Sequence, residues 1–505
     1  MLDKLIPEIN VGNDKVAIFS EKKDYYYSDL LKITKVLVNN LSTLGVKKGD
    51  RICLYSENCP ELIFLYLAIF KLGAIIVPIY ESSQINHFLK NSESNLLISK
   101  DENFLNKDYI DSNLLSRLEV VYFLDIGFIH NQYMPILIGD SSYSKSNIKD
   151  EDIAAIIYTS GSTGLAKGVV HTHRSMYLAS KNLTKTIKQD CNSITCISLS
   201  LCHVSGLIGQ LIATLISNGS MVLLSRFNAE KMIYSISKYK VSHLQMLSTN
   251  LTNLVYYIRT SKIPKADFKS LKSVMVGGDS APVRIQKDFL KLTNCTITQV
   301  MGMTESFSYF INLSKKDEKL GSVGLPALGV QIELRDNDGL VINKSDQIGE
   351  IFVKTFGNMM GYWRNDKDSR KTLNNGWLCT GDLAYRDHNG YYWFSGKKKQ
   401  LIEKNNIKIV PQEIENVLLN YSHVRDACVV GIKNKEDKNI LCACVVTEKN
   451  NTTEKDIREF CQLFLQSEKM PDKILFFERL FYKEGGKFDR NLISAKANQF
   501  YQTSL

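Results

Sequence analysis

The sequence alternates short apolar runs with longer segments of helical character. Runs such as RICLYS after Asp50, LLIS after Asn95 and IAAIIYTS after Asp152 have the length of buried strands, and helix-like segments separate them. Alternating strands and helices are typical of α/β proteins, because a parallel strand is reached only through a crossover connection. The pattern therefore predicts an α/β fold with largely parallel sheets.

The length of 505 residues exceeds what one ordinary hydrophobic core supports, so at least two domains are expected. Glycines crowd residues 321–396 among short strand patterns, which indicates a loop-rich β region. A compact α+β unit of about a hundred residues follows, a usual size for a small domain. The charged stretch at residues 397–401 separates the two parts, and we expect domains at residues 1–398 and 399–505.

The composition excludes several classes of protein. Hydrophobic residues at 44% and charged residues at 23% describe a globular chain, neither disordered nor fibrous. The formal charge of +10 is mild at this length and no nucleic-acid motif is recognised, so a solvated basic surface and no nucleic-acid partner are expected. The eleven cysteines form no Cys-x-x-Cys pair, which predicts reduced core thiols in a cytoplasmic protein.

No export signal and no transmembrane segment are expected. The N-terminus lacks a continuous apolar run of signal-peptide length. The most hydrophobic segment, residues 61–80, contains Lys71, Gly73 and Pro78. These residues favour a buried helix, a turn and a strand over a membrane span.

Residues 158–168, YTSGSTGLAKG, place glycines, hydroxyl residues and one lysine directly after an apolar run. Glycines let backbone N–H groups approach a ligand closely, and Lys167 adds a positive charge, so phosphate is the expected ligand. The Walker motif is excluded, because Ala166 and Gly168 stand where it requires a glycine and a hydroxyl residue. A flexible linker is the weaker alternative, since linkers seldom follow a buried strand and lead into further apolar sequence.

The same loop resembles the phosphate-binding signature of the adenylate-forming superfamily, which contains acyl-CoA synthetases, nonribosomal adenylation domains and luciferases. Ala166 in place of proline is the only mismatch to YTSG[ST]TG-x-PKG. Five further segments resemble superfamily motifs in the expected order: MGMTES at 301–306, GSVGLPALG at 321–329, WLCTGD at 377–382, GKKKQLI at 396–402 with VPQEIE at 410–415, and EGGKFDR at 484–490. The resemblance spans nearly the whole chain.

This resemblance implies a large N-terminal domain, with two stacked, mostly parallel α/β subdomains and a β-rich subdomain, and a small mobile α+β C-terminal domain. It also implies an acid–thiol ligase that uses ATP, Mg²⁺ and coenzyme A. A carboxylate is a poor acyl donor, so the acid is first converted to an acyl-adenylate with release of pyrophosphate. Coenzyme A then takes the acyl group and AMP leaves.

The motifs imply roles for individual residues of the large domain. Thr304 would donate to the α-phosphate, Glu305 would hold Mg²⁺, which prefers oxygen ligands, and Asp382 would accept both ribose hydroxyls. The β and γ phosphates would lie in the loop formed by Thr159, Ser160, Gly161, Ser162, Thr163, Gly164 and Lys167.

The adenine would lie near Gly278 and Gly302. Relatives often stack the purine on an aromatic residue before the second of these glycines, where this chain has Met301. A polarizable thioether can also pack against a purine face, so this departure is expected to alter affinity rather than abolish binding.

In the small domain, Lys487 would swing in to bridge the substrate carboxylate and the α-phosphate. The hinge position, usually aspartate or lysine, is Gln400, and Lys397 replaces an arginine near the nucleotide and cannot form a bidentate fork. Asn406 stands where a pantetheine-side loop often has glycine, and asparagine tolerates left-handed backbone better than most residues.

The segment 200–210 contains no aspartate for a substrate ammonium, and His203 begins an H-x-x-G sequence that resembles acyl- and aryl-CoA ligases. We therefore expect a fatty or aryl acid without an α-amine. His203 would be a gate near the carboxylate, or alternatively a satisfied core histidine. Coenzyme A is the expected acceptor, with an acyl carrier protein in trans as the alternative, and the protein is expected to be a monomer or homodimer.

A different class of function is a nucleotide-binding scaffold that has lost turnover. Met301, Lys397, Gln400 and Asn406 together motivate it, whereas retention of the residues with chemical roles argues against it. An oxidative, luciferase-like side activity leaves no recognisable signature. DNA binding through the positive charge is the weakest hypothesis, and salt-insensitive failure to retain DNA would remove it.

Overall fold

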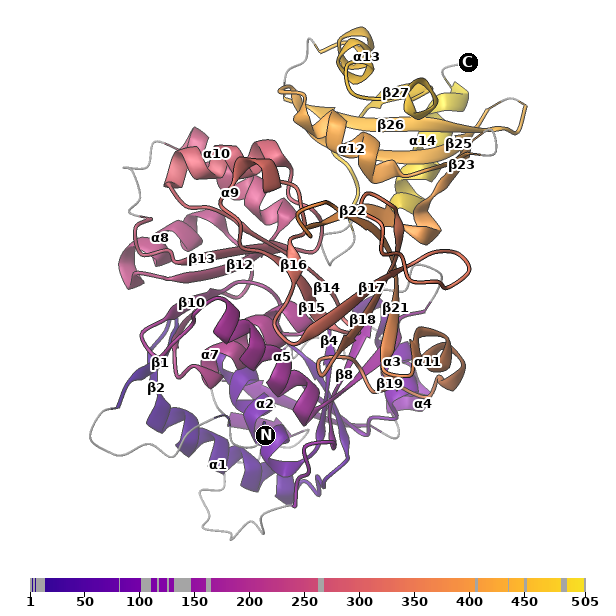
Figure 1. Ribbon diagram of the computed structural model, residues 1–505. Coiled ribbons are helices and arrows are strands. Elements are labelled where there is room, and N and C mark those ends of the chain that lie inside the picture. Colours follow the sequence, from indigo (N-terminus) through magenta and orange to yellow (C-terminus); the bar gives the residue numbers. More distant parts are fainter. Residues whose placement is uncertain are drawn as a thin grey trace.

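The computed structural model describes residues 2, 5, 14–80, 82–100, 110–115, 118–124, 127–130, 147–159, 165–261, 268–404, 407–434, 436–448, 452–482 and 488–503 (Figure 1). A large N-terminal body contains two mainly parallel sheets and an antiparallel sheet. A smaller α+β domain, orange to yellow in Figure 1, lies at one end of this body. This architecture confirms the predicted α/β class with a large N-terminal and a small C-terminal domain.

The first sheet supplies the strand ends that approach the small domain. Its central strands β1, β11, β10, β12, β13 and β14 pair in parallel, and the edges are antiparallel. Among the described residues its order is β16 (Leu325–Pro326), β15 (Phe307–Asn312), β14 (Thr298–Met303), β13 (Ser273–Gly277), β12 (His243–Leu247), β10 (Ile194–Ile197), β11 (Ser220–Leu223), β1 (Val16–Phe19) and β2 (Tyr25–Tyr26).

The second sheet contains the strands on either side of the predicted phosphate loop. Its central strands β8, β4, β3, β5 and β6 are parallel, whereas β9 and β19 add to one edge in antiparallel fashion. The order is β19 (Gly361–Tyr362), β9 (Lys167–Thr172), β8 (Ile153–Thr159), β4 (Ile75–Ile79), β3 (Arg51–Tyr55), β5 (Leu96–Ser99), β6 (Glu119–Leu124) and β7 (Gly127–His130).

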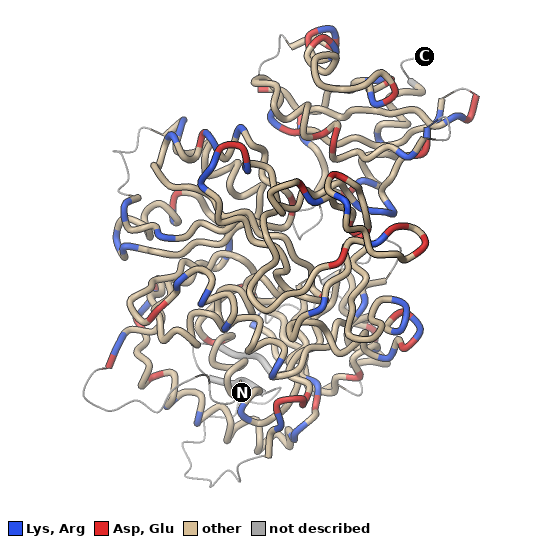
Figure 2. Tube along the Cα trace, viewed as in Figure 1, with Lys and Arg blue, Asp and Glu red and all other residues tan. Residues whose placement is uncertain are grey.

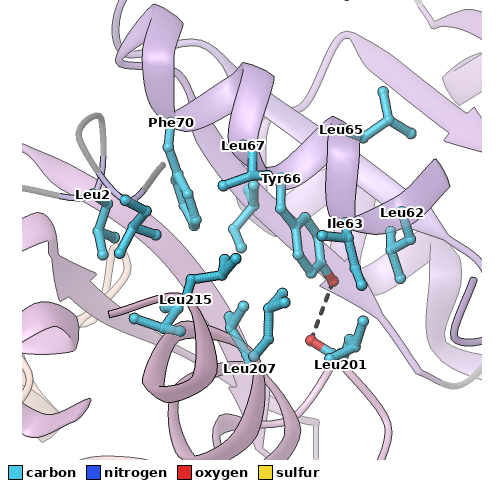
Figure 3. Close-up of a cluster of buried hydrophobic side chains, with 14 of the residues drawn as sticks. Leu2, Leu62, Ile63, Leu65, Tyr66, Leu67, Phe70, Leu201, Leu207 and Leu215 are labelled. Carbon is cyan, nitrogen blue, oxygen red and sulfur yellow. Dashed lines mark hydrogen bonds between the residues drawn. The ribbon is translucent and has the colours of Figure 1, made fainter. Parts of the chain in front are cut away.

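Helix α2 (Pro60–Leu72) lies in the core that joins these two sheets (Figure 3). Pro60 is pre-organised for the first turn, and Gly73 ends the helix with a left-handed φ of 71° before β4. Ten of its thirteen residues are buried, so the helix is apolar around its circumference, as a helix packed on all sides must be. The helix, turn and strand predicted for residues 61–80 are confirmed.

The remaining helices cover the sheets. Helices α8, α9 and α10 form a separate core with the first sheet, and α3 packs with the second. Their bounds, with those of the other helices of the large body, are α1 (Tyr27–Thr43), α3 (Ile85–Ser92), α4 (Ser112–Leu115), α5 (His173–Thr186), α6 (Val204–Gly206), the π-helix η4 (Leu207–Ile212), α7 (Ala213–Ile216), α8 (Ala229–Tyr239), α9 (Ser248–Thr260) and α10 (Val283–Thr293).

The antiparallel sheet fills the predicted β region between residues 321 and 396. Short strands and turns alternate there, as the glycine-rich sequence indicates, and the helix α11 (Asp366–Thr372) interrupts them. Its strands are β17 (Val330–Arg335), β18 (Gly349–Thr355), β21 (Trp377–Arg386), β20 (Leu373–Asn374) and β22 (Tyr392–Lys397).

The helices and strands of the small domain follow the short turn η6 (Lys398–Gln400). Two cores lie on opposite faces of its three-stranded sheet, and Cys442 and Cys444 are fully buried in one of them, as predicted. Its elements are β23 (Ile402–Lys404), β24 (Ile407–Ile409), α12 (Pro411–Asn420), β25 (Val424–Lys433), β26 (Asn439–Thr447), α13 (Glu454–Gln462), β27 (Lys473–Phe476) and α14 (Arg490–Thr503).

The distribution of charge, the apolar helices and the cysteines each bear on what the composition indicates. Lysine and arginine are interspersed with aspartate and glutamate in Figure 2 and form no continuous basic stripe in that view. Within the described ranges, no helix combines the length and the apolarity needed to span a bilayer. All eleven cysteines are free thiols.

Candidate active site

The phosphate-loop segment connects two antiparallel neighbours. β8 ends at Thr159 and β9 begins at Lys167, and these residues lie opposite each other, with Thr159 Oγ1 donating to the Lys167 carbonyl oxygen at 3.5 Å. The chain thus leaves and re-enters the sheet at one point, as a loop that wraps a ligand requires. The predicted cradle residues Ser160, Gly161, Ser162, Thr163 and Gly164 lie outside the described residues.

Lys167 is held by two side chains from the segment that follows β18. Its ammonium forms an ion pair with Asp368 of α11 and lies 5.1 Å from the ring centre of Tyr362 on β19. The side chains of the pair are 36% and 30% exposed, so solvent reaches both. The lysine predicted to bind phosphate therefore already faces an anion that a ligand phosphate can replace.

Thr304 and Glu305 lie in the tight turn between β14 and β15, where Phe307 has a positive φ of 59°. Nε2 of His171 on β9 donates to the Thr304 carbonyl oxygen at 2.8 Å. Burial lowers the pKa of His171 to about 4, so the ring is neutral at physiological pH. Glu305 is 8% exposed, and its carboxylate accepts from the hydroxyl of Tyr362 at 2.7 Å.

Asp382 is buried on β21, and both of its carboxylate oxygens have partners. The hydroxyl of Tyr309 on β15 donates to Oδ2 at 2.8 Å, and the Lys397 ammonium on β22 pairs with Oδ1. Each carboxylate oxygen has more than one acceptor direction, so a ribose hydroxyl can still approach. Lys397 makes a single contact to Asp382, as expected for a point charge in place of an arginine fork.

Three carboxylates from different elements act on Lys397. Burial alone would lower the pKa of the Lys397 ammonium, but the carboxylates of Asp382, Asp279 and Glu305 outweigh it and raise that pKa above its ordinary value. Asp279 follows β13, Glu305 follows β14 and Asp382 lies on β21. The structure therefore brings the predicted residues Glu305, Asp382 and Lys397, far apart in the sequence, to one site, together with Asp279.

The predicted adenine segments lie at the ends of two adjacent parallel strands, β13 and β14. Gly278 comes after β13 with a φ of +88°, and a Cβ there would lie 2.8 Å from the Leu247 side chain. At Gly302 on β14 an added Cβ would lie only 2.2 Å from the carbonyl oxygen of Phe307, so the turn requires glycine. Met301 is half-buried and packs against the cluster that contains Tyr309 and Phe310.

His203 precedes α6, and its ring centre lies 4.8 Å from that of Tyr80 at the end of β4. The segment before it is fixed by the Tyr66 hydroxyl of α2, which donates to the Leu201 carbonyl oxygen at 3.2 Å (Figure 3). A Cβ on Gly206 would lie 2.2 Å from the Ser200 carbonyl oxygen. The H-x-x-G glycine is therefore needed for close chain packing.

A cavity of about 590 Å³ lies between the large body and the small domain. Asp279, Lys397 and Gln400 line it from one side, and Tyr482 and Phe488 line it from the other. Lys487 lies outside the described residues, but its neighbour Phe488 stacks on Tyr482 with ring centres 5.0 Å apart. The described ends of the lysine-bearing segment therefore face the predicted nucleotide residues.

The end of that segment is tied to the core of the small domain. Arg490 binds both carboxylate oxygens of Glu415, at 2.6 and 2.9 Å, and donates to the Val429 carbonyl oxygen at 2.9 Å. Glu415 is 1% exposed, so this fork neutralises a fully buried charge. The arginine of the motif EGGKFDR thus anchors the segment that contains Lys487.

Sequence reasoning missed several residues that support the site: His171, Tyr309, Tyr362 and Asp368. Each acts through a side-chain contact to a residue far away in the chain, and none belongs to a motif with a known spacing. Hydrophobic patterning treats His171, Tyr309 and Tyr362 as ordinary strand residues, so it gives no signal for these contacts.

Comparison with known families covers almost the whole chain. The model for the AMP-binding enzyme family matches residues 8–363, and that for the AMP-binding enzyme C-terminal domain matches residues 413–487. The chain is 29% identical over 505 residues to a 2-succinylbenzoate–CoA ligase of Bacillus pumilus, covering 97% of each chain. It is 27% identical to the enzyme of that name from Bacillus subtilis, covering 96% of each.

Solved structures share the fold of this chain. o-Succinylbenzoate CoA synthetase from Bacillus subtilis, in complex with its acyl-adenylate intermediate, superposes with a TM-score of 0.82 at 25% identity, covering 96% of both chains. ATP-bound MatB from Rhodopseudomonas palustris shares the fold, with a TM-score of 0.88 at 22% identity and 99% coverage of both. The chain belongs to the AMP-binding enzyme family of the adenylate-forming superfamily and is an AMP-forming acid–thiol ligase of the acyl-CoA synthetase type.

Proposed function

We propose that this protein converts an aryl carboxylic acid without an α-amine into its coenzyme A thioester in two steps. In the first, an oxygen of the acid attacks the α-phosphorus of ATP, the bond to pyrophosphate breaks, and acyl-adenylate forms. In the second, the thiol of coenzyme A loses its proton and attacks the acyl carbon, and the bond to AMP breaks. A domain at residues 1–398 would hold the substrates, and residues 399–505 would move about Gln400 between the steps.

The observation that supports this proposal best is the set of charges around Lys397. Asp382 and Glu305, proposed for ribose and Mg²⁺, both act on this one ammonium, and Tyr362 links Glu305 to the phosphate-loop residue Lys167. A nucleotide that spans these groups would meet a donor for its phosphates at one end and an acceptor for its ribose at the other.

The residues fit Mg²⁺ bound together with ATP better than a metal held by the protein alone. Glu305 is a single buried carboxylate, and the described part of the chain contains no cluster of three or more His, Cys, Asp or Glu side chains suited to a metal ion. Mg²⁺ commonly binds one or two carboxylates plus substrate phosphates and water. When bound there, the ion would neutralise charge on the phosphates, while Thr304 would donate to the α-phosphate.

Lys487 is proposed to neutralise the charge that develops between the acid and the α-phosphate. Its support is the position of Phe488 and Tyr482 on the cavity shared with Asp279 and Lys397. His203, which precedes the close turn at Gly206, is proposed to lie beside the substrate carboxylate. The free state of all eleven cysteines supports a reducing, cytoplasmic location.

The relatives favour an aryl over a fatty acid. Several that match more than nine-tenths of this chain are named 2-succinylbenzoate–CoA ligases, at 27–29% identity, whereas a Bacillus subtilis long-chain-fatty-acid–CoA ligase is 25% identical. A succinylbenzoate-like aromatic acid is therefore the first substrate to test.

The deciding experiment measures pyrophosphate release from Mg·ATP across aromatic and aliphatic acids, with and without coenzyme A. The expected result is release with aryl acids that rises, and yields acyl-CoA, when coenzyme A is added. Acid-dependent release that hydroxylamine traps but coenzyme A does not change would replace coenzyme A by a carrier-protein acceptor. ATP binding without any turnover would support the scaffold hypothesis and overturn the proposal.

Lys487→Ala tests the mechanism separately. The variant should lose acid-dependent pyrophosphate release by at least about a hundredfold, the usual scale for removal of a group that stabilises transition-state charge. ATP binding should remain close to that of the wild type. Unchanged pyrophosphate release would remove Lys487 from the reaction.

A further inference from the structure

Tyr362 occupies an unusual position between two predicted parts of the nucleotide site. It lies on the short strand β19, opposite Val169 of β9, directly beside the strand that begins with Lys167. The residue is 9% exposed and packs with Val169, Met359 and Leu378. Its ring is therefore held rigidly by the edge of the second sheet.

The hydroxyl of Tyr362 points to Glu305. It donates to Oε1 at 2.7 Å, and the Met359 amide also donates to the Glu305 carbonyl oxygen at 2.7 Å. A tyrosine hydroxyl has an ordinary pKa of about 10, well above neutral pH. The hydroxyl therefore stays protonated and always donates, which fixes the orientation of the carboxylate.

The face of the same ring lies 5.1 Å from the ammonium of Lys167. A cation over an aromatic face is attracted by the negative potential of the ring. Lys167 also forms an ion pair with Asp368. The ring therefore holds the ammonium where a ligand phosphate can replace the Asp368 carboxylate. One side chain thus contacts both the acidic and the basic group proposed for Mg·ATP.

We propose that Tyr362 is a positioning residue for adenylation, which orients Glu305 through its hydroxyl and Lys167 through its ring. This inference rests on the proposed function, because Glu305 and Lys167 bind Mg²⁺ and phosphate only in that reading. The two contacts are separable. Tyr362→Phe removes the hydroxyl and keeps the ring, whereas Tyr362→Leu removes both.

The test is calorimetric titration of ATP in the absence of acid, with Mg²⁺ and with EDTA. In Tyr362→Phe, ATP binding with Mg²⁺ should weaken about tenfold, because a hydrogen bond to a charged group is lost, while binding with EDTA should be unchanged. In Tyr362→Leu, binding with EDTA should also weaken, by about threefold, because the support of Lys167 is lost.

Tyr27→Phe is the matched control. Tyr27 is also a buried tyrosine, 4% exposed, and its hydroxyl donates to the Gly219 carbonyl oxygen at 2.8 Å, which involves none of the proposed nucleotide residues. Equal ATP affinity of Tyr362→Phe and Tyr27→Phe with Mg²⁺ would overturn the inference. Thermal unfolding of each variant identifies loss of fold, and the Phe variant remains decisive if the Leu variant does not fold.

The binding measurement also separates this inference from the proposed function. A wild type that binds Mg·ATP but releases no pyrophosphate with any acid contradicts the proposed ligase activity. The loss of Mg²⁺-dependent affinity in Tyr362→Phe would still support the positioning role in that case. Normal turnover of the wild type with unchanged affinity in Tyr362→Phe would contradict only the role of Tyr362.

Discussion

Asp382 and Lys397 lie opposite each other on β21 and β22 and form an ion pair directly before the turn η6. The Asp382 side chain is 3% exposed and that of Lys397 is 31% exposed. The pair therefore links the buried carboxylate proposed to bind ribose to the last residue before η6. The same contact neutralises Asp382 and fixes the start of the segment around which the small domain would rotate.

Lys397→Met should destabilise the protein by about 3 kcal/mol, because breaking a buried pair leaves an uncompensated charge on Asp382. Lys398→Met is the control. Its partner Glu350 also accepts from the Cys379 thiol at 2.8 Å, and the Lys398 side chain is 50% exposed, so a loss of about 1 kcal/mol or less is expected. Urea unfolding measures both, and equal losses would contradict the special role of Lys397.

Asp368→Asn should tighten ATP binding about two- to threefold. Asp368 competes with the nucleotide phosphates for Lys167, and a half-exposed ion pair contributes little enough that the gain is small. Asp366→Asn removes the same charge from the same helix at an exposed position, which controls for long-range electrostatics. Weaker binding in Asp368→Asn than in Asp366→Asn would show that Asp368 orients Lys167 in the complex instead of competing.

Arg284 of α10 bridges the two domains. It donates to the carbonyl oxygens of Ser422 at 2.6 Å and Val424 at 3.0 Å. Lysine cannot make this forked contact, so Arg284→Lys should loosen the small domain. Tryptic cleavage after the exposed Lys398 and Lys399 should accelerate about fivefold, because the lost hydrogen bonds contribute roughly 1 kcal/mol to the docking of the small domain.

Arg259→Lys controls for this prediction. Arg259 lies on α9 and lines the same cavity, but it pairs with Asp288 of α10 within the large body, with 3.5 Å between Nη1 and Oδ2. Trypsin should cut this variant after Lys398 and Lys399 at the wild-type rate. Equal acceleration in both variants would mean that loss of any guanidinium on the cavity loosens the small domain, and would contradict the specific role of the Arg284 contact.

Much of the fold follows from local rules in the sequence. Residues 61–80 form a helix, a turn and a strand because Pro60 and Gly73 set the ends of the helix. The apolar helix between them is too short to span a membrane, so it is a buried element. Strand β26 contains the continuous apolar run LCACVV at residues 441–446, as a strand buried on both faces requires. Strand order in the two large sheets was not predicted, because it depends on contacts between segments far apart in the chain.

In the candidate site, too, local motifs were predictable and contacts between distant segments were not. Glu305 and Asp382 were proposed as site residues because motifs carry them at fixed spacings. Their orientation depends on the hydroxyls of Tyr362 and Tyr309, which come from other strands and have no spacing relation to the carboxylates. Nor does a motif indicate that Lys167 meets Asp368, since that contact requires β19 to pair with β9.

Asp426 gives the small domain a pH-dependent stability. It lies on the interdomain cavity and accepts from the Tyr482 hydroxyl, and burial raises its pKa to about 6 from an ordinary value of 3.8. A raised carboxyl pKa stabilises the fold below pH 3.8, and this contribution is lost as the pH rises towards 6. The wild type is therefore penalised at neutral pH for the charge on Asp426.

Asp426→Asn removes this penalty while keeping an acceptor for Tyr482. Relative to the wild type, the variant should gain about 1–2 kcal/mol of unfolding free energy between pH 5 and pH 8, since each pKa unit corresponds to about 1.4 kcal/mol. Urea unfolding at several pH values measures the difference. Glu436→Gln, at an exposed position on the β25–β26 turn, should show no such trend. If the difference in unfolding free energy between Asp426→Asn and the wild type does not change with pH, Asp426 has the same pKa in the folded and the unfolded chain.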